Sequence, residues 1–124
     1  MSSYAGYAAS LDDFYLTSSG LAATETTLFV YDQELFRNLT VKGSVYEPIR
    51  VMVSNRLARN GSDWTNIFRK HNSGTYNNEW TVVDYNLLQE HDSTKAEPLP
   101  NGVLTVLEHL PDQIIAQDKP SVLN

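Results

Sequence analysis

The residues best suited to chemistry lie together in the middle of the chain, in the segment from His71 to Tyr85. Within it, the run Thr75-Tyr76-Asn77-Asn78 puts a hydroxyl, a phenol and two amides on one short polar stretch, and an aromatic, β-branched run follows at once. Uncharged hydrogen-bond donors at the mouth of a buried strand can hold an oxygen that gains negative charge. The alternative is structural, because adjacent asparagines also favour a turn.

Other chemical motifs are missing from the sequence. It contains no phosphate-binding or dinucleotide-binding glycine motif and no zinc-protease motif, and no Gly-x-Ser-x-Gly element marks a serine as nucleophile. The three histidines, His71, His91 and His109, stand singly without the spacing of metal ligands, so neither a metal nor a cofactor is expected. His109 neighbours Glu108, and we expect these two residues to form a surface pair.

Composition limits the classes of protein to which the chain can belong. Its 124 residues suffice for one domain, or part of one, with a modest core. The net charge of −6, with basic residues scattered singly, argues against nucleic acid as a partner. No apolar run approaches the ~20 residues of a transmembrane segment, and residues 1–20 do not have the pattern of a signal peptide. The lack of cysteine excludes disulfides and a cysteine nucleophile within these residues.

The first third of the chain is predicted to form a β-hairpin. Residues 1–10 are small and polar and suit a loop or an edge. Leu11–Ser19 and Leu21–Tyr31 have the residue types of strands, and Gly20 between them predicts a tight antiparallel connection. Glu25 is the charged exception in the second strand, and a solvated strand face is its simplest interpretation.

The middle of the chain has a helical period. After one or two turns over Gln33–Leu39, Glu47-Pro48 opens a firmer helix that ends at Asn60-Gly61. The apolar residues of this helix predict one buried face: Ile49, Met52, Val53 and Leu57. Ser62 is expected to cap a second helix, and Gly74 to end it in the left-handed conformation. The buried side of the second helix is predicted to carry Trp64, Ile67 and Phe68.

The last part of the chain returns to strands. Trp80–Tyr85 alternates as a strand does, Asn86–Asn101 is polar and suits an exposed loop, and Val103–Leu110 is apolar enough for an inner strand. Pro111-Asp112 predicts a turn before a last strand over Gln113–Ala116. The order of elements predicts an α+β fold with a mostly antiparallel sheet and helices on one face.

Two triplets match the acceptor sequence for N-linked glycosylation. They begin at Asn38 and Asn60, both in polar positions near helix ends. They favour a secretory route, although such short triplets also arise by chance.

Three blocks of the sequence resemble the phospholipase B-like family, also called the lamina ancestor family. The blocks are DDFYLTSSGLAATETT, RVMVSNRLARNGSDWTNIFRKHNSGTYNNEWTVVDY and GVLTVLEHLPDQIIAQDK, and the element SGTYNNEW is specific. The resemblance covers almost the whole chain in order. It implies part of an N-terminal-nucleophile hydrolase fold, an αββα sandwich, found in lysosomal or secreted glycoproteins. It also implies a hydrolase that releases acyl chains from phospholipids or cleaves an amide.

In this family, internal cleavage exposes a cysteine whose thiol attacks and whose own α-amino group serves as base. Because the chain has no cysteine, the resemblance implies that residues 1–124 form a single partial domain, a fragment of the large subunit without its nucleophile. The expected partners are then the remainder of the precursor and a phospholipid or other acylated small molecule. Such a piece leaves sheet edges and one sheet face open. Two alternatives remain: an inactive remnant that serves as a binding module, and a small secreted recognition domain.

The resemblance also implies roles for individual residues. In this fold an asparagine side chain commonly helps to hold the oxyanion, which implies Asn77 or Asn78. Asn77 is favoured, with its amide directed inward from the start of the strand that follows, and Thr75 lies in the same polar block. The SGLAATETT block resembles the hairpin beside the catalytic centre. It implies pocket roles for three consecutive residues: Glu25, Thr26 and Thr27.

Two further positions follow from the same blocks. Arg56, in the NRLA match, is expected to brace the helix layer through a carboxylate. Glu79 stands where the family pattern has glutamine, which places an acid beside the asparagine pair.

Overall fold

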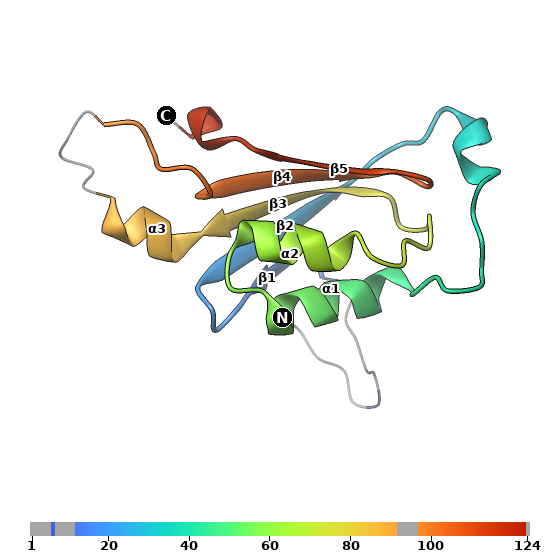
Figure 1. Cartoon of the computed structure of the whole chain (residues 1–124), viewed down its shortest axis with the longest axis horizontal. Coiled ribbons are helices and arrows are strands. Elements are labelled where there is room, and N and C mark those ends of the chain that lie inside the picture. The colour runs from blue at the N-terminus through green and yellow to red at the C-terminus, as the bar shows by residue number, and fades with distance from the viewer. Residues whose placement is uncertain (1–5, 7–11, 92–96, 124) are drawn as a thin grey trace.

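The computed structural model describes residue 6, residues 12–91 and residues 97–123, and the structural statements below concern those residues. They form an antiparallel sheet of five strands with three helices (Figure 1), so the predicted α+β class is confirmed. The interpretation of residues 1–10 as a loop or an edge lies outside the described part of the chain, apart from Gly6.

The sheet has its strands in chain order, each antiparallel to the next. Its strands are β1 (Phe14–Leu16), β2 (Leu21–Thr27), β3 (Asn78–Asp84), β4 (Leu104–His109) and β5 (Ile114–Asp118). This is the predicted sequence of a hairpin, a helical section and three further strands. Consecutive strands along the chain therefore always pair; β1–β2 and β4–β5 are joined by short turns, whereas the helices lie in the connection between β2 and β3.

The predicted hairpin of β1 and β2 turns at Gly20, whose φ of +81° lies in the left-handed region. β2 ends at Thr27 rather than at Tyr31, as the sequence had suggested. The reason lies in the partner strand. Thr27 pairs with Asn78, which is the first residue of β3, so the chain beyond it has no strand to pair with and Tyr31 is 90% exposed.

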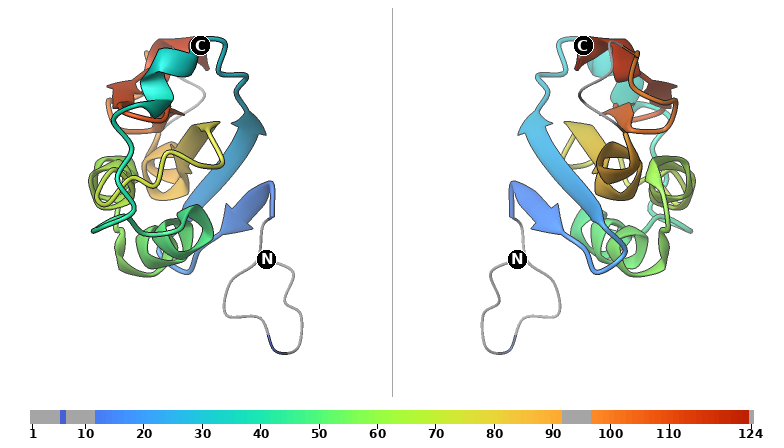
Figure 2. Two further views of the ribbon diagram at one scale, coloured as in Figure 1. Left: turned by 90° about the vertical axis from the view of Figure 1, so that its right-hand side faces the viewer. Right: turned by 90° about the vertical axis from the view of Figure 1, so that its left-hand side faces the viewer.

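Helices α1 (Glu47–Leu57) and α2 (Gly61–Phe68) lie on one face of the sheet, as predicted (Figures 1 and 2). The section before them contains one 3-10 turn, η1 (Gln33–Phe36), within the range where a short helix was expected. A second 3-10 turn, η2 (Pro120–Val122), follows β5. None of the described helices is long and apolar enough to cross a membrane.

The predicted buried face of α1 is wrong. Ile49, Val53 and Leu57 are 37%, 41% and 64% exposed. The buried residues of α1, three of which are polar or charged, are instead Glu47, Pro48, Arg50, Val51 and Ser54. Arg50 can occupy this face because the Phe68 carbonyl accepts its hydrogen bond, and such a partner cannot be recognised from apolar spacing alone.

Two helix boundaries also differ from the prediction, and side-chain caps explain both. The N-cap of α2 is Asn60, whose Oδ1 accepts from the Asp63 amide at 2.7 Å, whereas Ser62 lies inside the helix. Helix α3 (Tyr85–Glu90) occupies part of the segment expected to be a loop. The Asp84 carboxylate caps it by accepting from the amide of Asn86 at 3.0 Å.

The core between the helices and the sheet is aromatic. Trp64 and Phe68 of α2, predicted to be buried, stack on each other with ring centroids 5.0 Å apart, and both contact the ring of Trp80 of β3 at a tilt, at 5.1 and 5.6 Å. The strict alternation of β3 puts Asn78, Trp80, Val82 and Asp84 on this side. On the opposite side of the sheet, Phe14 and Leu16 remain 56% and 70% exposed.

Candidate functional site

The two candidate asparagines lie in different surroundings. Asn77 precedes β3, and its Nδ2 donates to the Gly74 carbonyl at 3.1 Å. Asn78 begins β3 on the same face as Trp80 and is 1% exposed, and neither atom of its amide has a partner among the described residues. Asn78 lies on the helix-covered face at the start of β3, whereas Asn77, whose Oδ1 is also buried without a described partner, precedes the strand. A role for either amide in holding an oxyanion remains a prediction.

The hairpin residues divide between the two faces of the sheet. Thr27 pairs with Asn78 and Glu25 with Trp80, so both belong to the helix-covered side, whereas Thr26 lies on the other side opposite Glu79. Glu25 is half-buried rather than on a solvated face, and burial raises the pKa of its carboxyl, with Asp13 raising it further. The structure thus brings Glu25 and Thr27 toward Asn78 and separates Thr26 from them.

The remaining predicted site residues lie at the surface. Thr75 is exposed, and its hydroxyl lies 3.0 Å from that of Ser73. Both glycosylation candidates, Asn38 and Asn60, are exposed. Among the described residues, no group of three or more His, Cys, Asp or Glu side chains could hold a metal ion.

A buried polar cluster that the sequence did not reveal adjoins Asn78. His109 is fully buried, so the expected surface pair with Glu108 is wrong. The register of β3 and β4 pairs Glu79 with Glu108, and the next residues, Asn78 and His109, therefore lie side by side on the helix-covered face. The alternation of β4 offered a signal, because it puts His109 in phase with the buried Leu107 and out of phase with Glu108.

Arg50 of α1 connects this cluster to the helix layer. Its Nη1 donates to the Phe68 carbonyl at 2.7 Å, its guanidinium lies 4.3 Å from the centre of the Phe68 ring, and its Nη2 lies 3.2 Å from His109 Nε2. Arg56, predicted to brace this layer through a carboxylate, is exposed and forms no ion pair with any described residue. Arg50 braces the layer instead, and it does so through a carbonyl and a ring.

Burial dominates the electrostatics of the cluster. It raises the pKa of Glu47, one turn before Arg50, to about 7, although the charge of Arg50 acts in the opposite direction. Burial, and then the charge of Arg50, lower the pKa of His109 to about 3, against a smaller opposing effect of the Tyr76 backbone. His109 is therefore neutral near neutral pH. Other buried polar atoms on this side lack a described partner, among them Glu25 Oε2, Arg50 Nε and Trp80 Nε1.

The segment between α2 and β3, residues 69–77, approaches the cluster in a strained conformation. His71, Gly74 and Tyr76 have φ values of +59°, +66° and +57°. Gly74 is left-handed, as predicted, but α2 already ends at Phe68, so this glycine shapes the segment and does not stop the helix. Left-handed backbone at a residue as bulky as tyrosine is unfavourable, and such strain concentrates at functional sites.

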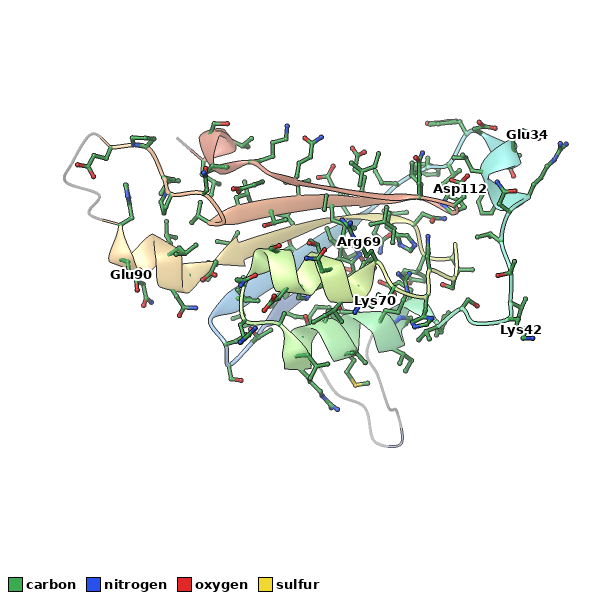
Figure 3. All side chains as sticks on the ribbon, in the orientation of Figure 1. Glu34, Lys42, Arg69, Lys70, Glu90 and Asp112 are labelled. Atoms are coloured by element: carbon green, nitrogen blue, oxygen red, sulfur yellow. The ribbon has the colours of Figure 1, made fainter. Side chains whose placement is uncertain are left out.

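This segment lies at one end of the sheet together with the β4–β5 turn. Figure 3 shows Arg69 and Lys70, where the segment begins, and Asp112, in the β4–β5 turn, toward the same end of the molecule. Asn72 joins the two regions, since its Nδ2 donates to the carbonyls of Leu110 and Pro111 at 3.0 and 3.1 Å. The arrangement can fix amide donors at the start of β3, beside the neutral side chain of His109.

Comparison with known proteins identifies the family. The sequence profile of the Phospholipase B family matches residues 1–124. A Caenorhabditis elegans protein named provisionally as phospholipase B-like 2 is 44% identical over 118 residues, which cover 94% of this chain and 19% of that protein. The human protein of the same provisional name is 42% identical over 123 residues, or 98% of this chain and 20% of the relative.

A protein of a third organism gives the same result. Phospholipase B-like protein G of Dictyostelium discoideum is 39% identical over 123 residues, covering 99% of this chain and 20% of its own length. The chain spans about a fifth of the length of these relatives. The SGTYNNEW block, the hairpin and the buried cluster thus occur in a chain that belongs to the phospholipase B family.

Proposed function

We propose that the chain is part of a phospholipase B-like hydrolase that cleaves acyl ester or amide bonds of lipids, and that the start of β3 supplies a hydrogen bond to the oxyanion. Family membership over the whole chain supports the reaction class. The observation that carries the site is Asn78, which is 1% exposed with both amide atoms lacking a described partner. An unsatisfied buried polar group costs about 1–3 kcal/mol, so such a group is typically retained where a partner or a reaction uses it.

The proposal places the nucleophile outside residues 1–124, because they contain no cysteine. In it, the chain is one partial domain of an αββα sandwich, and the remainder of the precursor supplies the cysteine and a second sheet. The open sheet side with Phe14 and Leu16 is available to such a sheet. The protein then acts in a lysosomal or extracellular setting and carries glycans on Asn38 and Asn60. Capping of α2 uses Oδ1 of Asn60 and leaves Nδ2, the atom that a glycan modifies.

The start of β3 offers two donors, and the structure favours Asn78 over Asn77. One N–H of Asn77 is already directed to the Gly74 carbonyl, whereas both N–H groups of Asn78 are free of described acceptors. An oxyanion is held best by donors that are fixed beforehand and not satisfied elsewhere. Asn78 also lies opposite Thr27 of β2 and beside the buried His109 of β4.

Mutation of each asparagine in the full-length gene product tests the proposal. The substrates are a phospholipid ester and an N-acyl amide with the same acyl chain. The ratio of their turnover numbers then shows whether the enzyme prefers an ester or an amide bond. Asn78→Ala is expected to lower turnover by about 10²–10³-fold, the usual effect of removing one oxyanion donor. Asn77→Ala is the comparison variant: loss of its hydrogen bond to Gly74 is expected to cost about 1 kcal/mol of stability and to lower turnover far less than Asn78→Ala does.

The outcomes separate the alternatives. Loss of turnover in Asn77→Ala but not in Asn78→Ala would assign the donor to Asn77. Full turnover in both variants would make the segment structural. A cleaved, cysteine-exposed wild-type protein that hydrolyses neither substrate would refute the hydrolase proposal itself.

A further inference from the structure

The side chain of Asn72, in the segment between α2 and β3, hydrogen-bonds to several separate parts of the fold. Its Nδ2 donates to the carbonyls of Leu110 and Pro111, which fixes the orientation of the amide. Its Oδ1 consequently faces the interior, where it accepts from the Gly74 amide at 2.9 Å. A single side chain thereby ties the β4–β5 turn to the segment that leads into β3.

The same oxygen also lies within hydrogen-bonding distance of two side chains of the buried cluster, His109 and Arg50. Asn72 Oδ1 lies 2.6 Å from His109 Nε2 and 3.4 Å from Arg50 Nη2. An amide oxygen only accepts hydrogen bonds, so His109 must carry its proton on Nε2. The 3.2 Å approach of Arg50 Nη2 to His109 Nε2 is then a contact between two donors that share this acceptor, and not a hydrogen bond between them. Asn72 is the acceptor around which both side chains are arranged.

A short relay leads from Asn72 to the candidate oxyanion donors. Asn72 Oδ1 accepts from the Gly74 amide, and the Gly74 carbonyl accepts from Asn77 Nδ2 at 3.1 Å. These two bonds hold the backbone through the left-handed residues Gly74 and Tyr76. Asn78 follows directly, so these bonds hold the stretch of backbone from which the Asn78 amide extends.

We propose that Asn72 is a positioning residue, which through Gly74 and Asn77 on one side and His109 on the other holds the Asn78 amide in place for the reaction. The inference rests on the proposed function, since it assigns to Asn72 a role in that same site. Asn72 does not touch the substrate. Its effect is on geometry, and a displacement of a catalytic group by about 1 Å can lower a rate by about 10²-fold.

The test compares three variants of the full-length gene product with the wild type, using the ester and amide substrates. Asn72→Ala removes every bond of the side chain. Asn72→Asp keeps an oxygen acceptor for Gly74, His109 and Arg50 but loses the two donors to the β4–β5 turn. Asn55→Ala is the matched control, because Asn55 is a half-buried asparagine whose Oδ1 accepts from Trp64 Nε1 at 2.8 Å and whose side chain makes no hydrogen bond to Gly74, Asn77 or His109.

A positioning role gives a defined kinetic pattern. Asn72→Ala should lower kcat by about 10–100-fold with KM changed less than about threefold, because ground-state binding is kept while the donor is displaced. Asn72→Asp should recover most of the lost kcat. Asn55→Ala should lose stability comparable to that of Asn72→Ala and retain the wild-type kcat.

Other results overturn the inference in recognisable ways. If kcat per folded molecule is unchanged in Asn72→Ala, or falls equally in Asn55→Ala, then Asn72 has only a structural role while the proposed function stands. If Asn72→Ala does not fold, the kcat of Asn72→Asp tests the inference instead. A kcat of Asn72→Asp as low as that of Asn78→Ala would show that an oxygen acceptor at this position does not restore activity, and would contradict the positioning role. A wild-type protein without hydrolase activity removes the proposed function, and with it this role for Asn72.

Discussion

Replacement of Glu47 by glutamine should reveal a buried carboxyl that resists ionisation. Glu47 is 2% exposed, and burial raises its pKa from 4.5 to about 7. Its neighbours act in opposite directions, since Arg50 lowers this pKa and Glu25 raises it. Because the folded protein binds the proton more tightly than the unfolded chain, the contribution to stability is complete below pH 4.5 and is lost as the pH rises through 7.

The magnitude follows from the size of the shift. One pKa unit corresponds to about 1.4 kcal/mol, so ionised Glu47 costs the fold at most about 3 kcal/mol at alkaline pH. Glu47→Gln keeps the shape of the side chain without the ionisation. Relative to the wild type, the variant should therefore gain about 2–3 kcal/mol of stability between pH 5 and pH 8. His109 titrates in both proteins, and its contribution largely cancels in this difference.

The measurement is the free energy of unfolding of the full-length gene product and its Glu47→Gln variant, from denaturant titrations at pH 5 and pH 8. Glu90→Gln is the control, because Glu90 is exposed at the end of α3 and its replacement should have little effect at either pH. If Glu47→Gln is destabilising by the same amount at both pH values, Glu47 is ionised in the fold and its attraction to Arg50 outweighs burial. That result would refute the reasoning.

Two further predictions concern the backbone. Gly74→Ala should lower the free energy of unfolding by about 1–2 kcal/mol or more, because its φ of +66° is left-handed and a new Cβ would contact Leu39. Gly43→Ala is the control: its φ is +85° but the space around it is open, so the same titration should show the backbone cost alone. Asn60→Ala should lower the free energy of unfolding by about 1 kcal/mol by removing the α2 cap. Ser62→Ala is the control, because it also destroys the glycosylation triplet but leaves the cap. Equal destabilisation of both variants in glycan-free protein would contradict the role of Asn60 as a cap.

Local sequence signals were sufficient for most elements of the fold. Gly20 between two β-rich runs predicted the hairpin, and the spacing of Trp64 and Phe68 predicted the buried side of α2. These features depend on residues close in the chain, where periodicity and turn preferences act directly. Even the misplaced cap of α2 had a local signal, because Asn60 is as favourable an N-cap as Ser62.

Features that depend on distant partners could not be predicted in this way. The spacing of Ile49, Val53 and Leu57 pointed to an apolar buried face of α1, yet Arg50 is buried, because the Phe68 carbonyl and Asn72 Oδ1 accept its hydrogen bonds. A charged side chain can be buried only where other parts of the fold supply hydrogen-bonding partners, and the spacing of apolar residues does not show which partners those are.

For the candidate site, the sequence by itself determined the residue types: an SGTYNNEW block with two adjacent amides, the absence of cysteine, and the blocks by which the chain resembles its family. The tertiary structure decided which amide turns inward, because the pairing of Thr27 with Asn78 fixes the first residue of β3 and strand alternation then assigns the faces. It also brought Asn72, Arg50 and His109 together from three separate elements. Hydrogen bonds between residues far apart in the chain form only once packing has placed their donors and acceptors, so this part of the site is a property of the fold.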